Sequence, residues 1–314
     1  MDKPLNTIGA LSIHFVYKEK FMVKYSVDKV KIRIDNFRIE DVQVMMNKLS
    51  VDSAVYNSYE SNKMTKCRYN YSIGEGEGAI YVGIAPNWIK EEKNLKSIVI
   101  EYNPNKVFPW FFESLELILW SDKLNWCVMS VDIACDIYED YSNLVMLKRD
   151  KREYFTKIGH SEVETQYLGV FGENGHIKFY NKAKERKVDI PWSRFEITLK
   201  GVKDVDCSFE RFKELCKIPV VYMKNNIEGV KDIERIVLSA MVEDIENLYS
   251  IKRYETRKKY EKLLAQFLNP VDIEVCCCYD TFVNFFNSIF DFTPRDGVHQ
   301  VECSGNAFGS KPKK

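Results

Sequence analysis

Residues 166–200 of this 314-residue chain read QYLGVFGENGHIKFYNKAKERKVDIPWSRFEITLK. The pattern predicts a strand, a glycine turn, a second strand, a basic connector and a third strand. Because side chains of a strand alternate between its two faces, one face would be apolar and suited to a core. The other face would carry His176, Lys178, Tyr180 and Lys182 from one strand and Arg194, Glu196 and Thr198 from the next.

An earlier segment, SVDIACDI at 130–137, alternates in the same way. Asp132 and Asp136 would share one face of this strand, while its Val, Ile and Cys residues would share the other. Three strands would then bring Tyr, Lys, Arg, Asp and Glu to one face of an open antiparallel sheet. We interpret that face as an active site.

The composition is that of an ordinary globular protein, with 45% hydrophobic residues, 29% charged residues and a formal net charge of zero. Bulk charge therefore gives no reason to expect a nucleic-acid partner, and only local clusters can indicate one. No apolar run is long enough for a membrane span, and no signal-peptide layout is present. The nine cysteines form no C-x-x-C pair, so we expect reduced thiols, neither a zinc site nor a disulfide framework, and a cytoplasmic location.

Strand and helix patterns together predict an α+β fold. Alternation predicts strands within 9–34, at 97–103 and on both sides of the GEGEG turn at 74–78, and helical spacing marks 37–49, 107–121 and most of the chain after residue 208. We predict two related antiparallel-sheet units with packed helices, followed by a mostly helical C-terminal region. The predicted domain limits are 1–125, 126–205, 206–300 for the helical region and 301–314 for a tail.

A weak internal repeat suggests that the two sheet units are related. AIYVGIAPNW followed by SIVIEYNPNK resembles QYLGVFGENG followed by HIKFYNKAKE. Matching the Tyr-Asn pairs sets Tyr102 opposite Tyr180. Tyr102 shares its face with Ile98 and Ile100 and is expected in the core, whereas the neighbours of Tyr180 are polar. We therefore expect the first unit to be structural and the second to carry the chemistry.

Several common catalytic motifs are absent from the sequence. The GEGEG turn lies between strands, lacks the Gly-Lys-Ser/Thr ending and carries two glutamates that would repel phosphate, so it predicts no nucleotide loop and no ATP-driven motor. The four histidines are widely separated, and no Ser nucleophile elbow is present. A histidine-based zinc site and a hydrolase triad therefore have little support.

Tyr180 is the candidate nucleophile because its predicted face is rich in basic residues. A free phenol has a pKa near about 10 and is a weak nucleophile at neutral pH. Nearby cations and a divalent metal would favour the phenolate, and the same cations would hold a phosphodiester as charge builds on its oxygens. His176 is either a ligand or proton carrier, or merely an exposed strand residue. The candidate catalytic set is Tyr180, Lys178, Lys182, Arg194 and His176.

Carboxylates on the same face are candidate metal ligands. Asp132 and Glu196 offer hard oxygen ligands of the kind that suits Mg²⁺ or Mn²⁺, with Asp136 as a third candidate. Two buried carboxylates without a cation would be costly. The alternative is that these acids form salt bridges to Arg194 and Lys178.

A basic segment, SIKRYETRKKYEK at 250–262, is the candidate DNA-backbone contact. The candidate DNA-binding residues are Lys252, Arg253, Arg257, Lys258 and Lys259. The alternative is a solvated helix with ion pairs between successive turns.

These segments resemble a known family. VDIACD at 131–136, YLGVFGENGHIKFYNKAKER at 167–186 and RFEITLK at 194–200 resemble three blocks of the plasmid rolling-circle replication initiators, a replication-initiation-factor family that includes relaxases of conjugative elements. EYNPNK at 101–106 and YETRKKYEKLL resemble a further block and the basic C-terminal helix of that family. The resemblance spans roughly residues 25–268.

The resemblance implies a site-specific nickase and strand transferase that depends on Mg²⁺ or Mn²⁺. Tyr180 would attack the origin phosphodiester, leaving a 5′-phosphotyrosyl bond and a free 3′-OH, while Asp132 and Glu196 would hold the divalent ion. The implied partners are double-stranded origin DNA, the nicked single strand, a host helicase, a DNA polymerase and often a second copy of the initiator.

The sequence departs from the family's pattern at three places. Asn181 stands where an acidic residue is usual, Val170-Phe171 replace the Ser-Arg of a Gly-Ser-Arg run, and Thr198 replaces a second carboxylate. Three alternatives therefore stay open: an initiator that binds the origin without cutting, a relaxase acting on a transfer origin, and a structural or interaction protein without DNA binding.

Overall fold

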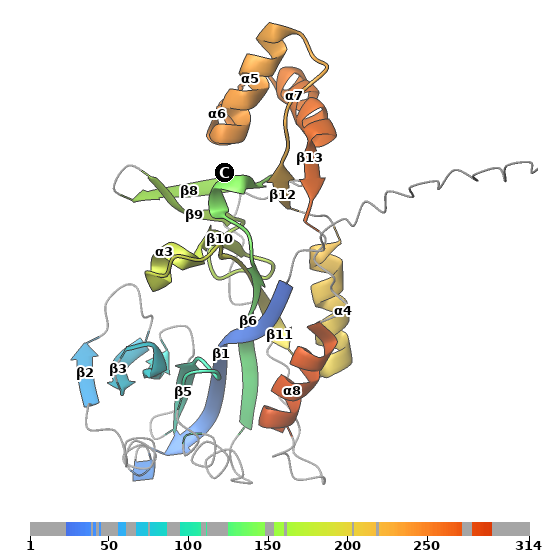
Figure 1. The fold of residues 1–314 in the computed structure, drawn as a ribbon. Coiled ribbons are helices and arrows are strands. Elements are labelled where there is room, and N and C mark those ends of the chain that lie inside the picture. Colours follow the sequence, from blue (N-terminus) through green and yellow to red (C-terminus); the bar gives the residue numbers. More distant parts are fainter. Residues whose placement is uncertain are drawn as a thin grey trace, which may run out of the picture.

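The computed structural model describes residues 23–38, 56–60, 67–74, 76–86, 95–107, 125–147, 154–159, 162–202, 204–217, 220–271 and 278–290, with residues 40, 41, 44 and 111. A ten-stranded antiparallel sheet in the order β2-β3-β4-β5-β1-β6-β11-β10-β9-β8 forms the centre of the molecule, and a three-stranded sheet has the order β13-β12-β7. Helices pack against these sheets (Figure 1), which confirms the predicted α+β class.

The large sheet consists of two halves with the same strand order. The first half contains β1 (Val23–Arg38), β2 (Tyr56–Glu60), β3 (Cys67–Ile73), β4 (Ile80–Pro86) and β5 (Leu95–Tyr102). The second half contains β6 (Asn125–Ile137), β8 (Tyr154–Gly159), β9 (Glu162–Leu168), β10 (Ile177–Asn181) and β11 (Ser193–Val202). In each half the first strand lies beside the last, and the others follow outward in reverse chain order.

This topology corrects the alignment of the internal repeat by one strand. Its order makes β5 the counterpart of β11, whereas matching the Tyr-Asn pairs had set β5 against β10. Tyr102 is nevertheless buried, at 2% exposure, as its apolar face predicts. The halves are joined by the long pairing of β1 with β6, so the sheet runs continuously through both. The domain limits read from the sequence stay predictions.

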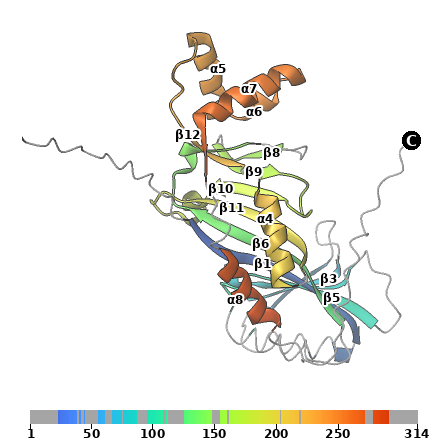
Figure 2. The ribbon, with the colours of Figure 1, turned by 90° about the vertical axis from the view of Figure 1, so that its right-hand side faces the viewer.

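The apolar face of the sheet is covered by α4 (Val205–Cys216) and α8 (Tyr279–Phe290), as Figures 1 and 2 show. Phe212 of α4 and Phe282 of α8 are buried, with ring centroids 5.5 Å apart. Phe212 also meets Tyr25 of β1 edge to face at 6.3 Å. With one face of the sheet sealed in this way, the polar residues of the same strands occupy the other face.

A second, smaller core lies at one end of the molecule (Figure 1). It is built from α5 (Asp232–Glu243), α6 (Glu246–Tyr249) and α7 (Tyr254–Phe267) with β7 (Leu144–Met146), β12 (Val221–Lys224) and β13 (Leu268–Pro270). Leu238, Leu248 and Leu264 are fully buried there. The sequence did not predict the three strands, because elements of three or four residues are too short to show an alternation.

Several local expectations are corrected by the structure. Phe37 and Arg38, expected to start a helix, belong to β1, while residues 40, 41 and 44 are helical. The rest of that predicted helix, and all of the one at 107–121 except residues 107 and 111, lie outside the described residues. The basic connector is a short helix, α3 (Lys182–Arg186), in which Asn181 Oδ1 accepts a hydrogen bond from the Lys184 amide at 2.8 Å.

The described cysteines bear on the expectation of reduced thiols. Five described cysteines are free thiols: Cys67, Cys135, Cys207, Cys216 and Cys278. Cys127 is disulfide-bonded, so the expectation of reduced thiols is wrong at that position. Within the described part of the chain, no helix combines the length and apolar character needed to cross a membrane.

Candidate active site

The register of the central strands brings the predicted polar residues together. In the β10–β11 pair, Lys178 lies opposite Glu196 and Tyr180 opposite Arg194. In the β11–β6 pair, Arg194 lies opposite Asp136, and Thr198 lies opposite Asp132. Residues directly opposite each other in a sheet point to the same side. The three strands therefore share one polar face, as their alternation predicts.

Tyr180 is at the centre of this face and is partly exposed. Its Oη donates a hydrogen bond to Glu196 Oε1 at 2.6 Å. Lys182 Nζ donates to the same Oη at 3.5 Å and lies 5.5 Å from the ring centroid. Lys178 Nζ donates to the other Glu196 oxygen at 3.0 Å. The partly exposed phenol thus contacts a carboxylate that can take its proton and the ammonium group of Lys182, while Lys178 contacts the same carboxylate from its other oxygen.

The protonation of this pair differs from the sequence expectation. Burial and the adjacent Glu196 carboxylate raise the pKa of Tyr180 above its ordinary value, outweighing the opposite effect of Arg194. Of the nearby cations, Arg194 does favour the phenolate as expected, but burial and Glu196 outweigh its effect in this arrangement. Burial also opposes ionisation of Glu196, but Lys178 and the hydrogen bond from Tyr180 outweigh it and lower the pKa of Glu196. The resting pair is a neutral phenol and an ionised carboxylate.

Lys178 lies between the two carboxylates that were expected to hold a metal ion. Its Nζ is 3.0 Å from Glu196 Oε2 and 3.8 Å from Asp132 Oδ2. Thr198 Oγ1 donates to the other oxygen of Asp132 at 2.7 Å. Burial lowers the pKa of Lys178, but Glu196 and Asp132 outweigh this effect and the pKa is raised. Lys178 is therefore the cation of this carboxylate pair.

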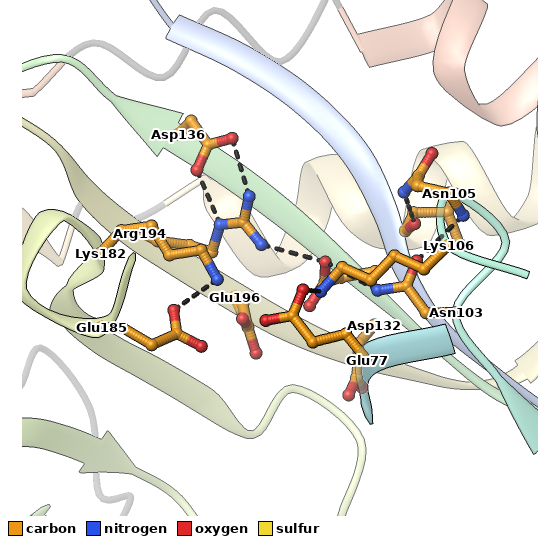
Figure 3. A network of polar contacts seen from close by, with 12 residues as sticks. Glu77, Asn103, Asn105, Lys106, Asp132, Asp136, Lys182, Glu185, Arg194 and Glu196 are labelled. Atoms are coloured by element: carbon orange, nitrogen blue, oxygen red, sulfur yellow. Dashed lines mark hydrogen bonds and ion pairs between the residues drawn. The ribbon is translucent and has the colours of Figure 1, made fainter. Parts of the chain in front are cut away.

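Asp136 is engaged by Arg194 and Trp192, and Figure 3 shows its two contacts with Arg194. Arg194 donates from Nε to Asp136 Oδ1 at 2.7 Å and from Nη2 to Oδ2 at 2.9 Å. Trp192 Nε1 donates to Asp136 Oδ1 at 2.8 Å. The remaining arm of Arg194, Nη1, donates to Asp28 at 3.0 Å. A two-point Arg–carboxylate pair of this kind is strong and directional, so Asp136 is a structural anchor for Arg194.

These contacts test whether the residues fit the expected divalent ion. Within the described residues, no three His, Cys, Asp or Glu side chains are grouped so that they could hold a metal. Asp136 is taken by Arg194, and Lys178 occupies the space between Asp132 and Glu196. The observed arrangement is the salt-bridge alternative, and a three-carboxylate site is not formed. A divalent ion could share the remaining two carboxylates only after the ammonium group of Lys178 moved away.

Lys182 reaches the site from α3 rather than from a strand. β10 ends at Asn181, and Lys182 is the first residue of the helix. It is 2% exposed and forms an ion pair with Glu185 (Figure 3). The alternation rule thus gave the correct face for Lys182, although the strand stops one residue earlier.

His176 is buried against two aromatic rings rather than exposed on its strand. It is 3% exposed, its ring is stacked on Tyr167 at 5.7 Å, and Phe171 meets it edge to face at 5.4 Å. Burial, followed by the charge of Lys178, lowers the pKa of His176 to about 4. At neutral pH the ring is therefore uncharged.

This burial predicts a pH effect on stability. The pKa of His176 is about 4 in the folded protein and 6.5 ordinarily, so the unfolded chain takes up the proton first as the pH falls. Stability from this group is complete above pH 6.5 and is lost between 6.5 and about 4, by up to about 3 kcal/mol. Urea unfolding should show a smaller loss over this pH range for His176→Phe than for the native chain. Equal losses would contradict the assignment.

Two partners of the site were not identified from the sequence. Asp28, which binds Arg194, lies where the β1–β6 register shifts between Val27 and Lys29. Alternation cannot place a residue at such a bulge, because the extra residue breaks the period of two. Trp192 directly precedes β11, outside the alternating pattern. The sequence indicates only that its indole N–H needs a hydrogen-bond partner if it is buried, and does not indicate which one.

The predicted DNA-binding segment is a helix only from Tyr254 onward, so Lys252 and Arg253 precede α7. Both are exposed. On the helix, Lys258 pairs with Glu261 at 2.7 Å and Arg257 approaches the same carboxylate at 3.8 Å. Lys259 also has an acidic partner, in α5. The solvated-helix alternative thus describes the helical residues, and DNA binding stays a prediction.

Fold and site together define an α+β protein with a tyrosine–glutamate–lysine cluster on the open face of an antiparallel sheet. No family model matches the chain. The chain is 28% identical over 203 residues to a protein of Staphylococcus aureus named "Replication initiation protein", covering 60% of this chain and 59% of that protein. The chain thus spans less than two thirds of the length of this relative.

A solved structure is also similar. The rolling circle replication initiator protein from Geobacillus stearothermophilus shares 14% sequence identity, with a TM-score of 0.37 over 68% of this chain and 91% of that one.

Proposed function

We propose that this protein initiates rolling-circle replication of a plasmid or mobile element by nicking and rejoining one strand of origin DNA. The observation that carries the proposal is the 2.6 Å hydrogen bond from Tyr180 Oη to Glu196 Oε1 on a partly exposed, lysine-rich face. A nucleophile within hydrogen-bond reach of its base is the geometry that covalent catalysis requires. The family resemblance supplies the substrate class.

In the proposed reaction, Tyr180 Oη attacks a backbone phosphorus while Glu196 takes the phenol proton. The bond between phosphorus and the 3′ oxygen breaks, and that oxygen leaves with a proton from solvent as a free 3′-OH. The 5′ phosphate stays attached to Tyr180. Transfer of the proton during the attack is required because the raised pKa of Tyr180 disfavours a free phenolate beforehand.

The two lysines beside the phenol would stabilise the phosphate. Lys182 lies at 3.5 Å from Tyr180 Oη, and Lys178 is on the neighbouring position of the same face. Ammonium groups held in place beside developing phosphate charge lower the barrier without further reorganisation. Rejoining is the reverse reaction, in which a 3′-OH attacks the phosphotyrosyl bond, so no ATP is required.

Dependence on Mg²⁺ or Mn²⁺ is part of the family expectation and stays a proposal. In the described arrangement Lys178 supplies the positive charge between Asp132 and Glu196, so the steps above use only side chains of this chain. When bound, a divalent ion would supply additional polarisation of the scissile phosphate.

The partners are proposed on the same basis. Double-stranded origin DNA would be the substrate, and the nicked single strand the covalent product. A host helicase and DNA polymerase would act on the exposed strand and 3′-OH, and a homodimer of the initiator would fit the family pattern. A relaxase acting on a transfer origin would use the same chemistry on a different site.

A second candidate is an origin-binding initiator that does not cut. The raised pKa of Tyr180 and the engagement of both Glu196 oxygens favour it, because both oppose release of a nucleophilic phenolate. The decisive experiment is incubation with supercoiled DNA carrying the cognate origin, with Mg²⁺, with Mn²⁺ and with a chelator. Relaxed DNA bearing covalently attached protein supports nicking, whereas a footprint on DNA that stays supercoiled under every condition supports the second candidate.

The basic residues ahead of α7 give a separate prediction. Replacing both Lys252 and Arg253 with alanine should weaken binding to duplexes of any sequence and should reduce the slope of log K against log salt by about 2. The matched control is the alanine replacement of Lys213 on α4 and of Lys217 directly after it, two solvent-accessible lysines on the side of the sheet that α4 covers. Equal salt slopes for the two double variants would contradict a phosphate contact before α7.

A further inference from the structure

The loop between β9 and β10 presents an apolar residue to solvent beside the candidate active site. Phe171 is 80% exposed and Val170 is 57% exposed. Within the described residues, no other large hydrophobic side chain reaches the exposure of Phe171. Leaving a phenylalanine in water forgoes the stabilisation that its burial would provide, so its position calls for an explanation.

The loop that carries Phe171 is fixed to the sheet rather than free. Three hydrogen bonds attach it to β11: Gly175 N to Thr198 O at 2.8 Å, Thr198 N to His176 O at 2.9 Å, and Lys200 N to Asn174 Oδ1 at 2.9 Å. Within the loop, Glu173 N donates to Val170 O at 3.0 Å, closing a turn around Phe171. The ring of Phe171 is therefore displayed on a preorganised turn.

Phe171 is the outer member of a row of three aromatic rings. Its ring meets His176 edge to face at 5.4 Å and 73°, and His176 is stacked on Tyr167 at 5.7 Å and 16°. Tyr167 lies directly opposite Lys178 in the β9–β10 register. The aromatic row therefore adjoins the lysine that contacts Glu196 in the candidate site.

The row lies at a distance from Tyr180 that suits a flanking nucleotide. His176 immediately precedes β10, and Tyr180 follows it by four positions, which corresponds to about 13 Å along an extended strand. Lys178 lies between them on the same face, and Lys200 lies beside the loop at 3.8 Å from Glu173. Each lysine is paired with a carboxylate, and each can turn to a phosphate of a single strand whose base stacks on the aromatic platform.

We propose that Phe171 stacks on an unpaired base of the DNA strand close to the phosphate attacked by Tyr180. This inference rests on the proposed function and adds a base-binding subsite to it. Every base has an aromatic face, so the subsite tolerates any sequence. Bases of an intact duplex are already stacked on each other, so the subsite selects melted DNA.

The test uses a short oligothymidylate with a single 2-aminopurine, whose fluorescence falls when it stacks. The native protein should bind this strand and quench the analogue. Phe171→Ala should bind roughly 5- to 100-fold more weakly, with the quenching lost, and Phe171→Trp should restore both. Binding to a fully paired duplex should be unchanged in all three proteins. The matched control is Ile190→Ala, another exposed apolar residue at 47% exposure, which lies between α3 and β11 at the other end of β10.

Three results would overturn the subsite, and none depends on whether Tyr180 is the nucleophile. The first is equal affinity and quenching for Phe171→Ala and the native protein. The second is an equal loss for single-stranded and duplex DNA, which would mark a general surface contact. The third is a native protein that nicks origin DNA but neither binds nor quenches the oligonucleotide. The proposed function is tested by a separate measurement: it fails if no covalent adduct forms on supercoiled origin DNA.

Discussion

Replacing Tyr180 with phenylalanine should abolish the covalent protein–DNA adduct and reduce nicking of origin DNA on the order of 10³-fold or more. The substitution removes the attacking oxygen and leaves the ring in place, so the packing of β10 is retained. Glu196 loses one hydrogen bond but keeps Lys178 as a partner at 3.0 Å. The stability loss should therefore be only about 1 kcal/mol. The measurement is a denaturing gel of labelled origin DNA after incubation with each protein.

Tyr141→Phe is the matched control for this experiment. Tyr141 Oη accepts a hydrogen bond from Gln166 at 3.0 Å, and its ring packs on Phe179 at 4.9 Å. This variant loses one hydrogen bond of a partly buried tyrosine, as Tyr180→Phe does, but should form the adduct normally. An adduct with Tyr180→Phe would show that another residue is the nucleophile. Loss of the adduct in both variants would indicate a structural effect.

The polar face could be predicted from the sequence because alternation is a local property of the chain. Lys178 and Tyr180 share a face of β10, and Arg194 and Glu196 share a face of β11, because the side-chain period is two. Burial of the apolar faces of both strands in one core then brings the two polar faces to the same side of the sheet. Alternation also predicts the buried residues between them. Phe179, between Lys178 and Tyr180, points to the other face and is fully buried. Local patterns thus determined which residues line the site.

The partner of each charged residue could not be predicted, because pairing depends on the register between strands. Asp132 and Asp136 lie on the same face of β6 and are equivalent by alternation. The register sets Arg194 opposite Asp136 and leaves Thr198 opposite Asp132, so one acid is neutralised by Arg194 and the other by Lys178. A shift of four residues would preserve the face and would set Arg194 opposite Asp132 instead of Asp136.

The raised pKa of Tyr180 also could not be predicted, because it too depends on which group the residue contacts. The sequence indicates how many cations share its face, but the phenol responds to burial and to the group that it contacts. That group is the Glu196 carboxylate at 2.6 Å, which disfavours a second negative charge. Composition of a face therefore predicts a candidate nucleophile, while the contact geometry decides how its proton is removed.

Replacing Lys178 with methionine should have the largest effect on stability and should change how the site responds to divalent ions. Asp132 and Glu196 are 8% and 6% exposed, and Lys178 is the ammonium group that lies between them. Removing one partner of a buried ion pair leaves an uncompensated charge, at a cost on the order of 3 kcal/mol. The midpoint of thermal unfolding should fall by roughly 5–10 °C without added metal.

Mn²⁺ should reverse most of this loss. Without Lys178, the two carboxylates face each other across a space that a hard divalent ion fits. Mn²⁺ bound to the folded chain alone would stabilise it by mass action and raise the unfolding midpoint. We expect Lys178→Met to bind Mn²⁺ more tightly than the native protein, as measured by the electron paramagnetic resonance signal of free Mn²⁺. Lys178→Arg keeps the positive charge and should resemble the native protein in both measurements.

The double variant Lys178→Met with Asp132→Asn distinguishes a created metal site from general ion binding. It lacks one of the two carboxylates, so the gain in Mn²⁺ affinity should disappear while the exposed acidic residues of the surface are unchanged. If the native protein instead binds Mn²⁺ as tightly as Lys178→Met does, the ammonium group of Lys178 moves away at little cost in free energy. The site could then carry out the metal-dependent reaction expected for the family. If neither protein binds, the pair Asp132–Glu196 serves Lys178 alone, because the ammonium group and a divalent ion require the same oxygens.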